Sequence, residues 1–363
     1  MHALKDKLHQ QQQKLKHLKQ RVFHAQSLVL SQLTPYEVIA EYQHAQVRYY
    51  AAPNARYKEP LVFVAPLAVN MAIYDLYPYR SLIAYFQQQG FDVYLIDWGK
   101  LDYRHQSLNF LSFIDDLIPN CIQHVLQHAQ TEQISLHGWS MAGIFVTLYT
   151  ALQQPKAVKN LLVMGSPIDS YASGHIGQLF STLHRYLSKY PKLYDYIEQE
   201  KIPKKWLHTP GILNTLGFKL IDPRGWMNSQ KNLFTRLNDL HALYEHATIA
   251  DFLNHMIDYP GGINQDMVLH LWLQNPLKHG SIQLQGRHIS LKNIQCSILV
   301  GAGDHDQIVT EDAAKPLIAL TNSSDITFTL IPGGHLGLMS SQRSAEEFWP
   351  KMRDWLHTRS TQK

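Results

Sequence analysis

The segment HGWSMAG at residues 137–143 constrains the fold of this chain more than any other part of its sequence. A β-type run leads into the segment, and a helical run over Met141–Leu152 follows it. A serine held in a tight strand-to-helix turn needs small residues two positions before and two after it, because the turn brings the two backbones together. Gly138 and Ala142 occupy these positions around Ser140. The segment therefore predicts a serine whose hydroxyl projects from the end of a sheet strand.

Short β-rich runs alternate with helical runs on both sides of this turn. The expected strands are Gln46–Tyr50, Leu61–Ala65, Asp92–Asp97, Gln133–His137, Asn160–Gly165, Cys296–Gly301 and Ile326–Ile331. The expected helices are Tyr79–Gln89, Phe110–His128 with a kink or division at Pro119, Met141–Leu152, Thr310–Leu320 and Ser344–Leu356. This alternation predicts a mostly parallel sheet with helices on both faces. Together with the serine turn, it predicts an α/β-hydrolase fold.

The chain divides by pattern into four segments. Residues 1–33 are predicted to form an amphipathic helix, and residues 34–167 the first part of the α/β core. Residues 168–293 break the alternation, since they are helical, irregular and rich in Tyr, Trp, His and Leu. We interpret them as an inserted, mainly helical cap. The core then resumes over residues 294–363.

A serine hydroxyl is a poor nucleophile at neutral pH, so it needs a base within hydrogen-bond reach and an acid that orients the base. In this fold the order along the chain is serine, acid, histidine. His335 follows the last predicted strand, between the glycines of PGGHLG, and is the predicted base. The loop after the preceding strand contains Asp304 and Asp306. We favour Asp306 because the following Ile308-Val309 would anchor the loop and point that carboxylate inward. Asp304 and, after an earlier strand, Asp169 are the alternatives.

Acyl transfer also needs two donors for the negative charge that develops on the carbonyl oxygen. The backbone N–H of Met141 is one predicted donor, because it directly follows the serine. The other is expected in the loop after Leu61–Ala65, where Val69 is the first choice and Ala68 the second. The sequence contains no His-x-x-Glu-His, paired Cys-x-x-Cys or phosphate-loop motif, so neither a metal nor a bound cofactor is predicted.

Composition narrows the function classes. The 363 residues carry a formal net charge of +4, which is too small to indicate nucleic-acid binding without a supporting motif. The two cysteines, Cys121 and Cys296, lie in separate apolar segments and predict neither a disulfide nor a metal site. No secretory signal and no apolar run of membrane-spanning length is apparent, so we expect a cytoplasmic protein.

The N-terminal segment has a seven-residue apolar repeat and a basic polar face. Leu8, Leu15, Val22 and Val29 carry the repeat, and six lysines and arginines lie between residues 5 and 21. One interpretation is a solvated helix docked on the domain. The other is a helix that binds a helical partner or an apolar or anionic surface through residues 1–30.

The motifs around the predicted strands resemble those of poly(3-hydroxyalkanoate) synthases, chiefly the class III catalytic subunit. The resemblance covers about Thr34 to Ser341 and is strongest in the block LVFVAPLAVNMAIYDLYPYRSLIAYFQQQGFDVYLIDWG. The matching residues are Asn70, Asp75, Pro78, Arg80, Ser81, Leu82, Asp97, Trp98, Gly99, Gly286, Leu291, Asp306 and Gly333 to Gly337. The resemblance implies an α/β-hydrolase core with a helical cap. It also implies transfer of hydroxyacyl groups from coenzyme A thioesters to a growing polyester, a helical partner protein, and association with polymer granules.

The sequence departs from that family at the nucleophile, where the family has a cysteine and this chain has Ser140. A serine forms an oxygen ester, which is less activated toward further chain transfer, so water or another alcohol becomes a natural acceptor. The first hypothesis is a synthase-like acyltransferase that acts through Ser140 on hydroxyacyl-CoA or polyester chains. The second is a serine hydrolase, namely an esterase, thioesterase or polyester depolymerase. The third is an inactive protein that binds granules, a helical partner or a second copy of itself.

Overall fold

The computed structural model describes residues 2–221, 227, 230–231 and 233–363. Within them, an eight-stranded sheet has the order β1-β2-β4-β3-β5-β6-β9-β10. Its strands are β1 (Glu37–Tyr42), β2 (Ala45–Tyr50), β3 (Leu61–Val64), β4 (Val93–Asp97), β5 (Ile134–Trp139), β6 (Val158–Met164), β9 (Ser297–Gly303) and β10 (Ile326–Ile331). In this order, the neighbouring strands β4, β3, β5, β6, β9 and β10 are parallel to one another. Strand β2 is antiparallel to both β1 and β4, so β1 and β2 form an antiparallel edge. The predicted fold class is confirmed.

Every predicted strand is present, with its ends displaced by at most two residues. Strand β1 was not predicted from the sequence, and its residues are exposed or half-buried because it lies at the edge of the sheet. An edge strand of this kind lacks the continuous apolar run that marks the buried strands, such as β3 and β4.

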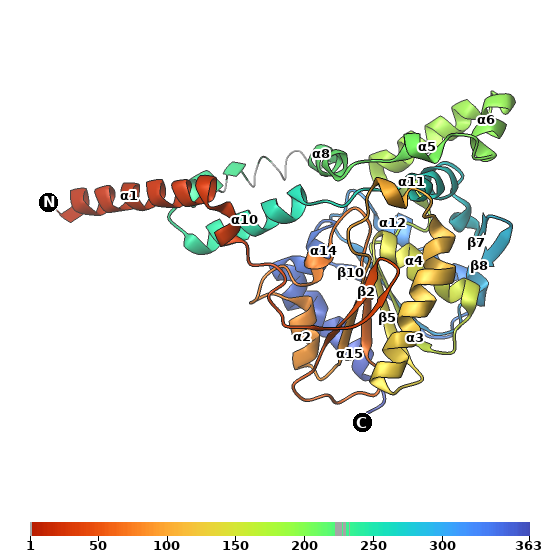
Figure 1. Ribbon diagram of the computed structural model, residues 1–363, viewed down its shortest axis with the longest axis horizontal. Helices are drawn as coiled ribbons and strands as arrows, with labels where there is room; N and C mark the ends of the chain where they lie inside the picture. Colours follow the sequence, from red (N-terminus) through yellow and green to blue (C-terminus); the bar gives the residue numbers. More distant parts are fainter. Residues whose placement is uncertain (1, 222–226, 228–229, 232) are drawn as a thin grey trace.

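Helices cover both faces of the sheet (Figure 1). On one side lie α2 (Leu82–Gln88) and α15 (Trp349–His357), and on the other lie α3 (Ile118–Ala129) and α4 (Met141–Gln153). The helix predicted over Phe110–His128 is divided near Pro119, as predicted. A π-helical turn, Ser112–Leu117, comes first, and α3 begins directly after it at Ile118. A second π-helical turn, Ser344–Phe348, precedes α15.

Two helix predictions need correction. The helix predicted over Thr310–Leu320 is two short helices, α12 (Glu311–Ala314) and α13 (Leu317–Leu320). Pro316 separates them, because proline has no N–H to continue the helical hydrogen bonds. The helix predicted from Tyr79 begins only at Leu82, where the Ser81 side chain accepts a hydrogen bond from the Ala84 N–H at 3.1 Å and caps the helix.

The inserted region is mainly helical up to residue 279. Its helices are α5 (Gly174–Leu187), α6 (Pro191–Glu198), α7 (Lys204–Leu207), α8 (Gly211–Ile221), α10 (Leu240–Asn254), α11 (Gly261–Asp266), a π-helical turn Met267–Leu273 and a 3-10 turn Pro276–His279. An unpredicted hairpin of β7 (Ser281–Leu284) and β8 (Arg287–Ser290) follows. Ile282, Leu284 and Ile289 of this hairpin are buried in the main core. We therefore propose residues 168–279 as the helical cap, instead of 168–293.

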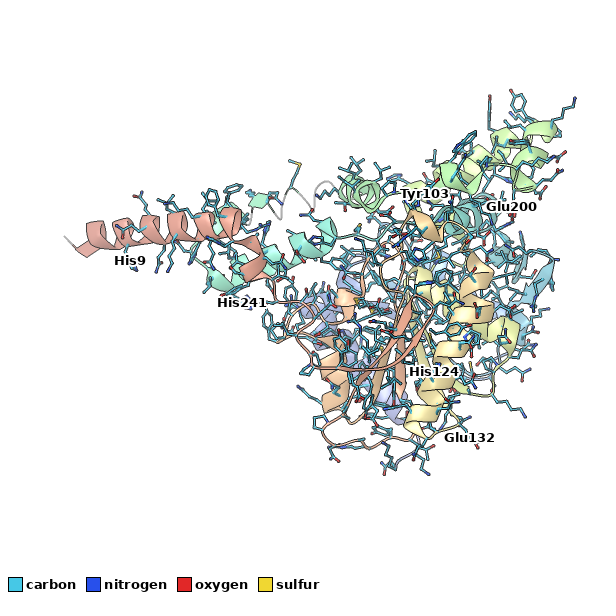
Figure 2. The ribbon with its side chains drawn as sticks, viewed as in Figure 1. His9, Tyr103, His124, Glu132, Glu200 and His241 are labelled. Carbon is cyan, nitrogen blue, oxygen red and sulfur yellow. The ribbon has the colours of Figure 1, made fainter. Side chains whose placement is uncertain are left out.

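The N-terminal helix α1 (His2–Phe23) ends at Phe23 and not at residue 33 as predicted, and it projects from the body of the molecule (Figure 1). It is followed by a 3-10 turn, Ala25–Leu28, whose Leu28 is buried with Leu237, Leu243 and Ala247. His9 lies on the projecting part of α1 (Figure 2). Across the described ranges, no helix combines the length and apolar character that crossing a membrane requires.

His137 is a fully buried histidine in β5, next to the serine turn. Its ring lies 4.7 Å from the Phe63 ring and 5.7 Å from the Tyr74 ring, centroid to centroid. Neither ring nitrogen has a hydrogen-bond partner among the described residues. Burial lowers the pKa of His137 to about 3, so the ring is neutral in the folded protein.

We expect the variant His137→Phe to lose less stability than the wild type as the pH falls from 7 to 5. The unfolded chain binds a proton at His137 near its ordinary pKa of about 6.5, whereas the folded chain binds it only near pH 3. The stability that this depressed pKa contributes is present above pH 6.5 and declines as the pH falls toward 3. Urea unfolding at the two pH values should show a drop about 2 kcal/mol smaller in the variant. Equal drops in both proteins would contradict this account.

Candidate active site

Ser140 occupies a strained turn between β5 and α4. Its backbone has φ 58° and ψ −125°, a region that residues other than glycine seldom adopt. The Ser140 N–H donates to the carbonyl oxygen of Met164 at 2.8 Å, which joins the turn to the neighbouring strand β6. The turn therefore has the geometry that the sequence predicted, with Ser140 at the end of a central strand.

Close backbone packing explains the small residues of the turn. A Cβ atom at Gly138 would lie 2.4 Å from the carbonyl oxygen of Ala142. A Cβ atom at Gly143 would lie 1.9 Å from the Ser166 hydroxyl oxygen. The Ser166 hydroxyl donates to the Ser140 carbonyl oxygen at 2.8 Å, so Ser166 supports the turn from β6. The sequence gave no signal for this contact, because Ser166 belongs to no motif and lies 26 residues from Ser140.

The structure brings together the three side chains predicted as a triad. The Nε2 atom of His335 lies 2.9 Å from the Ser140 Oγ atom, and its Nδ1 atom lies 2.7 Å from Asp306 Oδ2. His335 and Asp306 are buried, whereas Ser140 is half-buried. The His335 ring packs against Trp139 with centroids 5.1 Å apart. This arrangement allows His335 to accept the proton of the Ser140 hydroxyl.

The local contacts of the three candidate acids differ. Asp306 Oδ1 accepts hydrogen bonds from the N–H groups of Ile308 and Val309 at 2.8 and 2.9 Å, which leaves Oδ2 for His335. Asp304 is exposed, and its Oδ1 atom accepts from the Gly333 N–H at 2.7 Å.

Asp169 lies in contact with other groups. Its carboxylate forms an ion pair with Lys278 at 2.9 Å and accepts from the Asn275 amide at 2.7 Å. Only Asp306, among the three acids weighed, contacts His335.

A small chamber of about 200 Å³ adjoins Ser140 and His335. It is lined mainly by apolar side chains, among them Leu67, Val69, Trp139, Leu213 and Tyr259. Leu213 belongs to α8, and Tyr259 precedes α11, so the inserted region forms one wall of the chamber. These two residues were not predicted as part of the site, because they lie in an irregular segment of the sequence that carries no motif.

Of the two predicted backbone donors, Val69 lines this chamber, and Met141 directly follows Ser140, which lines it. Met141 is the first residue of α4, so its N–H has no acceptor within the helix. Val69 and Ala68 both line the chamber, and the Val69 N–H has no acceptor within the described residues. Ala68 has φ 70°, and its carbonyl oxygen accepts from the Ile257 N–H at 2.8 Å. The inserted region thus holds the loop that carries Val69.

Neither cysteine is placed to act as the nucleophile. Cys121 is buried in α3, and Cys296 directly precedes β9. Burial raises the pKa of each thiol to about 12, so both are protonated at neutral pH.

Three side chains of the inserted region have potential metal-ligand atoms within 4.8 Å of one another, namely Glu200, Asp266 and His270. The His270 Nε2 atom lies 3.3 Å from Glu200 Oε1, and Asp266 Oδ2 accepts from the Phe110 N–H at 2.8 Å. Burial raises the pKa of Asp266 to about 6. These contacts account for the cluster without a metal.

Comparisons with known proteins agree with the fold. The sequence model described as the alpha/beta hydrolase fold matches residues 70–342. The chain belongs to the α/β-hydrolase fold family. A monoglyceride lipase from Saccharomyces cerevisiae, 12% identical, superposes with a TM-score of 0.57 over 92% of this chain and 96% of that chain, and this likeness concerns the fold alone.

Relatives in sequence confirm the resemblance described above. The poly(3-hydroxyalkanoate) polymerase subunit PhaC of Haloferax mediterranei is 27% identical over 90% of this chain and 64% of its own length. The protein of the same name from Allochromatium vinosum is 28% identical over 85% of this chain and 83% of its own length. The chain therefore spans less than two thirds of the Haloferax relative and most of the Allochromatium one.

The packing at Gly143 predicts a specific rescue. Gly143→Ala should destabilise the protein by about 1–3 kcal/mol through overpacking against Ser166. Adding Ser166→Gly should recover most of this loss, because the clashing atoms belong to that side chain. Gly138→Ala is the matched control, since its clash is with backbone and the same second substitution should not rescue it. Urea midpoints would be compared for the two glycine variants, for Ser166→Gly alone and for the two double variants. A lack of coupling between residues 143 and 166 would refute the contact.

Proposed function

We propose that this chain is an acyltransferase of the polyhydroxyalkanoate synthase type that forms an acyl-enzyme at Ser140. The observation that carries the proposal is the continuous hydrogen-bonded series from Ser140 through His335 to Asp306, at a chamber lined by Ser140, His335 and Val69. The sequence similarity to poly(3-hydroxyalkanoate) polymerases supports hydroxyacyl-CoA or polyester chains as substrates.

In the proposed first half-reaction, the Ser140 Oγ atom attacks the carbonyl carbon of a thioester or ester. His335 takes the hydroxyl proton at Nε2, and Asp306 stabilises the resulting imidazolium through Nδ1. The N–H groups of Met141 and Val69 donate to the carbonyl oxygen as it becomes negative. When the bond to the leaving sulfur or oxygen breaks, His335 returns the proton to that atom and the acyl group remains on Ser140.

In the second half-reaction, His335 takes the proton of a hydroxyl group as its oxygen attacks the acyl carbon of the Ser140 ester. The bond between that carbon and Ser140 Oγ then breaks, and His335 returns the proton to Oγ. If the hydroxyl belongs to another hydroxyacyl group the chain grows, and if it belongs to water the acyl group is released. The oxygen ester at Ser140 favours the second outcome more than a thioester would, so a serine hydrolase acting on the same substrates is the alternative function. Neither half-reaction uses a metal or a bound cofactor, and coenzyme A would enter only as the leaving group of the substrate.

Mass spectrometry of the protein, together with analysis of the products, after incubation with 3-hydroxybutyryl-CoA tests both half-reactions. We expect one acyl adduct on Ser140, none in Ser140→Ala, and a rate of adduct formation about 10³–10⁴-fold lower in Asp306→Asn. Asp304→Asn is the matched control and should keep most of the rate, because Asp304 contacts Gly333 and not His335. Insoluble polymer among the products would indicate synthesis, and free 3-hydroxybutyrate would indicate hydrolysis. An adduct that persists in Ser140→Ala would overturn the assignment.

We further propose that residues 1–30 bind an apolar granule surface. Leu15, Val22 and Phe23 of α1 are 54%, 63% and 74% exposed, although each is apolar. Helices α5, α6 and α8 lie along the same side of the molecule as α1 (Figure 1), and they also expose apolar side chains. These are Leu179, Leu183, Tyr186, Leu193, Tyr196, Ile212, Leu213, Leu216 and Leu220. Many exposed apolar side chains on one side of a molecule are typical of an interaction site.

The triple variant Leu15→Gln, Val22→Gln, Phe23→Gln should sediment less with polyhydroxybutyrate granules than the wild type does. The exposed side chains contribute little to folding, so the variant should keep the thermal midpoint of the wild type. Lys14→Gln with Lys16→Gln and Lys19→Gln is the control that removes charge from the same helix. Loss of binding only in the control would indicate an anionic surface instead. A change in the oligomeric state without a change in sedimentation would indicate a helical partner or a second copy.

A further inference from the structure

A second and larger cavity, of about 480 Å³, lies in the inserted region next to the Ser140 chamber. Asn214 and Tyr259 line both spaces, so the two adjoin at these residues. The Tyr259 hydroxyl makes no hydrogen bond within the described part of the chain. The volume lies in the range of small-molecule binding sites, which is about 300–1,000 Å³. An acyl group on Ser140 could therefore continue past Tyr259 into this cavity.

The cavity wall favours an uncharged ligand. Ile197, Trp206, Met267 and Leu273 supply apolar surface, and none of the described residues that line it is lysine or arginine. Glu200 lines the cavity as well and adds negative charge. The phosphate groups of coenzyme A would find no cation here, so the acyl part of a substrate is the better match.

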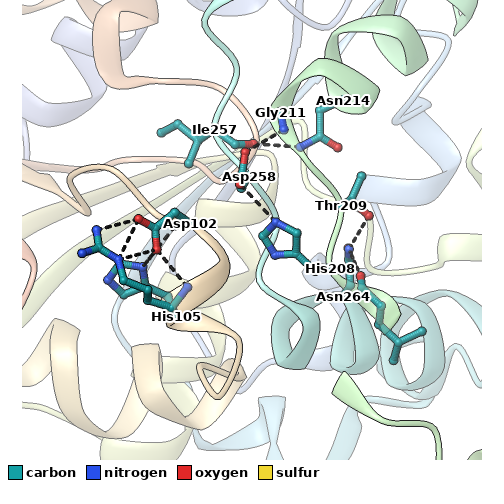
Figure 3. A network of polar contacts seen from close by, with 11 residues as sticks. Asp102, His105, His208, Thr209, Gly211, Asn214, Ile257, Asp258 and Asn264 are labelled. Carbon is teal, nitrogen blue, oxygen red and sulfur yellow. Dashed lines mark hydrogen bonds and ion pairs between the residues drawn. The ribbon is translucent and has the colours of Figure 1, made fainter. Parts of the chain in front are cut away.

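One side of the cavity is held by a network of polar contacts (Figure 3). The Asp258 carboxylate accepts from the Gly211 N–H at 2.7 Å and lies 3.1 Å from the His208 Nε2 atom. The Asn214 amide donates to the Ile257 carbonyl oxygen at 2.8 Å, and the Asn264 amide donates to Thr209 Oγ1 at 2.7 Å. His208, Thr209, Asn214 and Asn264 all line the cavity. Specific hydrogen bonds thus hold the side chains of this wall in place, as expected for a binding site and not for a packing gap between helices.

Two polar groups of this wall have no partner among the described residues. Gln265 is 5% exposed, and neither its amide oxygen nor its amide nitrogen is hydrogen bonded. The Nδ1 atom of His208 is likewise buried and unpaired. The Nε2 atom of His208 faces Asp258 Oδ2, so Nδ1 is the ring nitrogen that a polar group of a ligand could contact. Buried polar groups are nearly always hydrogen bonded, so this pair indicates a ligand with polar atoms of its own.

We propose that this cavity binds the distal part of an oligomeric hydroxyacyl chain whose first acyl group lies at Ser140. Such a chain is uncharged and mostly apolar, and it carries ester carbonyl groups that can accept from the Gln265 amide. Its terminal hydroxyl, which can donate or accept, can form a hydrogen bond with His208 Nδ1. A plain alkyl chain would match the apolar wall but would leave both polar groups unpaired. The inference rests on the proposed function for the position of the first acyl group.

Binding to the Ser140→Ala protein tests the cavity without any need for turnover. The ligands are the methyl ester of a linear 3-hydroxybutyrate trimer and methyl dodecanoate, measured by titration calorimetry. Val268 lines the cavity and is 41% exposed, so it lies at the mouth. Val268→Trp should narrow the mouth and weaken trimer binding about tenfold. Val38→Trp is the matched control, because Val38 is 40% exposed on β1 and lines neither cavity. It should leave binding unchanged.

Gln265→Leu separates an ester chain from an alkyl chain. This variant should weaken trimer binding about tenfold, as expected for one lost hydrogen bond, and should leave dodecanoate binding unchanged. Its thermal midpoint without ligand should not fall, because the amide has no partner to lose. Equal effects on the two ligands, or none from Val268→Trp, would overturn the proposal, as would competition of free coenzyme A with the trimer. Failure of Ser140 to form an adduct in the wild type would refute the proposed function and leave this binding result standing.

Discussion

The backbone of Ser140 and the three close approaches around it determine how the rest of the site is built. A residue with a side chain at φ 58° persists only where its surroundings hold it. Here the Met164 carbonyl, the Ser166 hydroxyl and the contact between Gly138 and Ala142 provide that support. The first two depend on β5 and β6 pairing in parallel in the observed register, whereas the third lies within the turn itself. The position of the nucleophile is therefore a property of the central sheet, and the cap can vary without moving it.

Two of the residues that carry the resemblance to poly(3-hydroxyalkanoate) synthases contact the ends of the loop that carries Val69. The Trp98 indole N–H donates to the Ala65 carbonyl oxygen at 2.6 Å, at the start of this loop. Asn70 accepts from the Ala72 N–H at 2.9 Å, just after it. A third, Asp97, forms a buried ion pair with Arg48 at 2.6 Å, which joins β4 to β2. The Trp98 and Asn70 contacts hold the two ends of the loop on which one proposed oxyanion donor lies.

The sequence predicted the strands of the core well, and it placed the three residues of the proposed triad at strand ends, because both follow from local rules. Buried parallel strands are continuous apolar runs, and the turn at Ser140 and the loops at Asp306 and His335 each lie directly after a strand. The inserted region could not be predicted in the same way. Leu213, Asn214 and Tyr259 reach the chamber only through the tertiary packing of α8 against the segment before α11, and no periodicity or motif marks them. The hairpin β7–β8 was missed for a related reason, since its four-residue strands are too short to show a pattern.

Core and cap therefore supply different parts of the proposed reaction. The core provides Ser140, His335 and the backbone donors, and these are sufficient for acyl transfer to any hydroxyl. The fate of the acyl group depends on which hydroxyl reaches the oxygen ester, and that is decided where the cap meets the chamber. A wall that retains the acyl chain and excludes water would offset the lower reactivity of an oxygen ester, because the hydroxyl of an incoming hydroxyacyl group would then be the acceptor that reaches Ser140. In the proposed reaction, a serine nucleophile is thus compatible with polymer chemistry only if the cap holds the chain. The cap at Asn214 and Tyr259, where the chamber adjoins the larger cavity, would then decide between a synthase and a hydrolase.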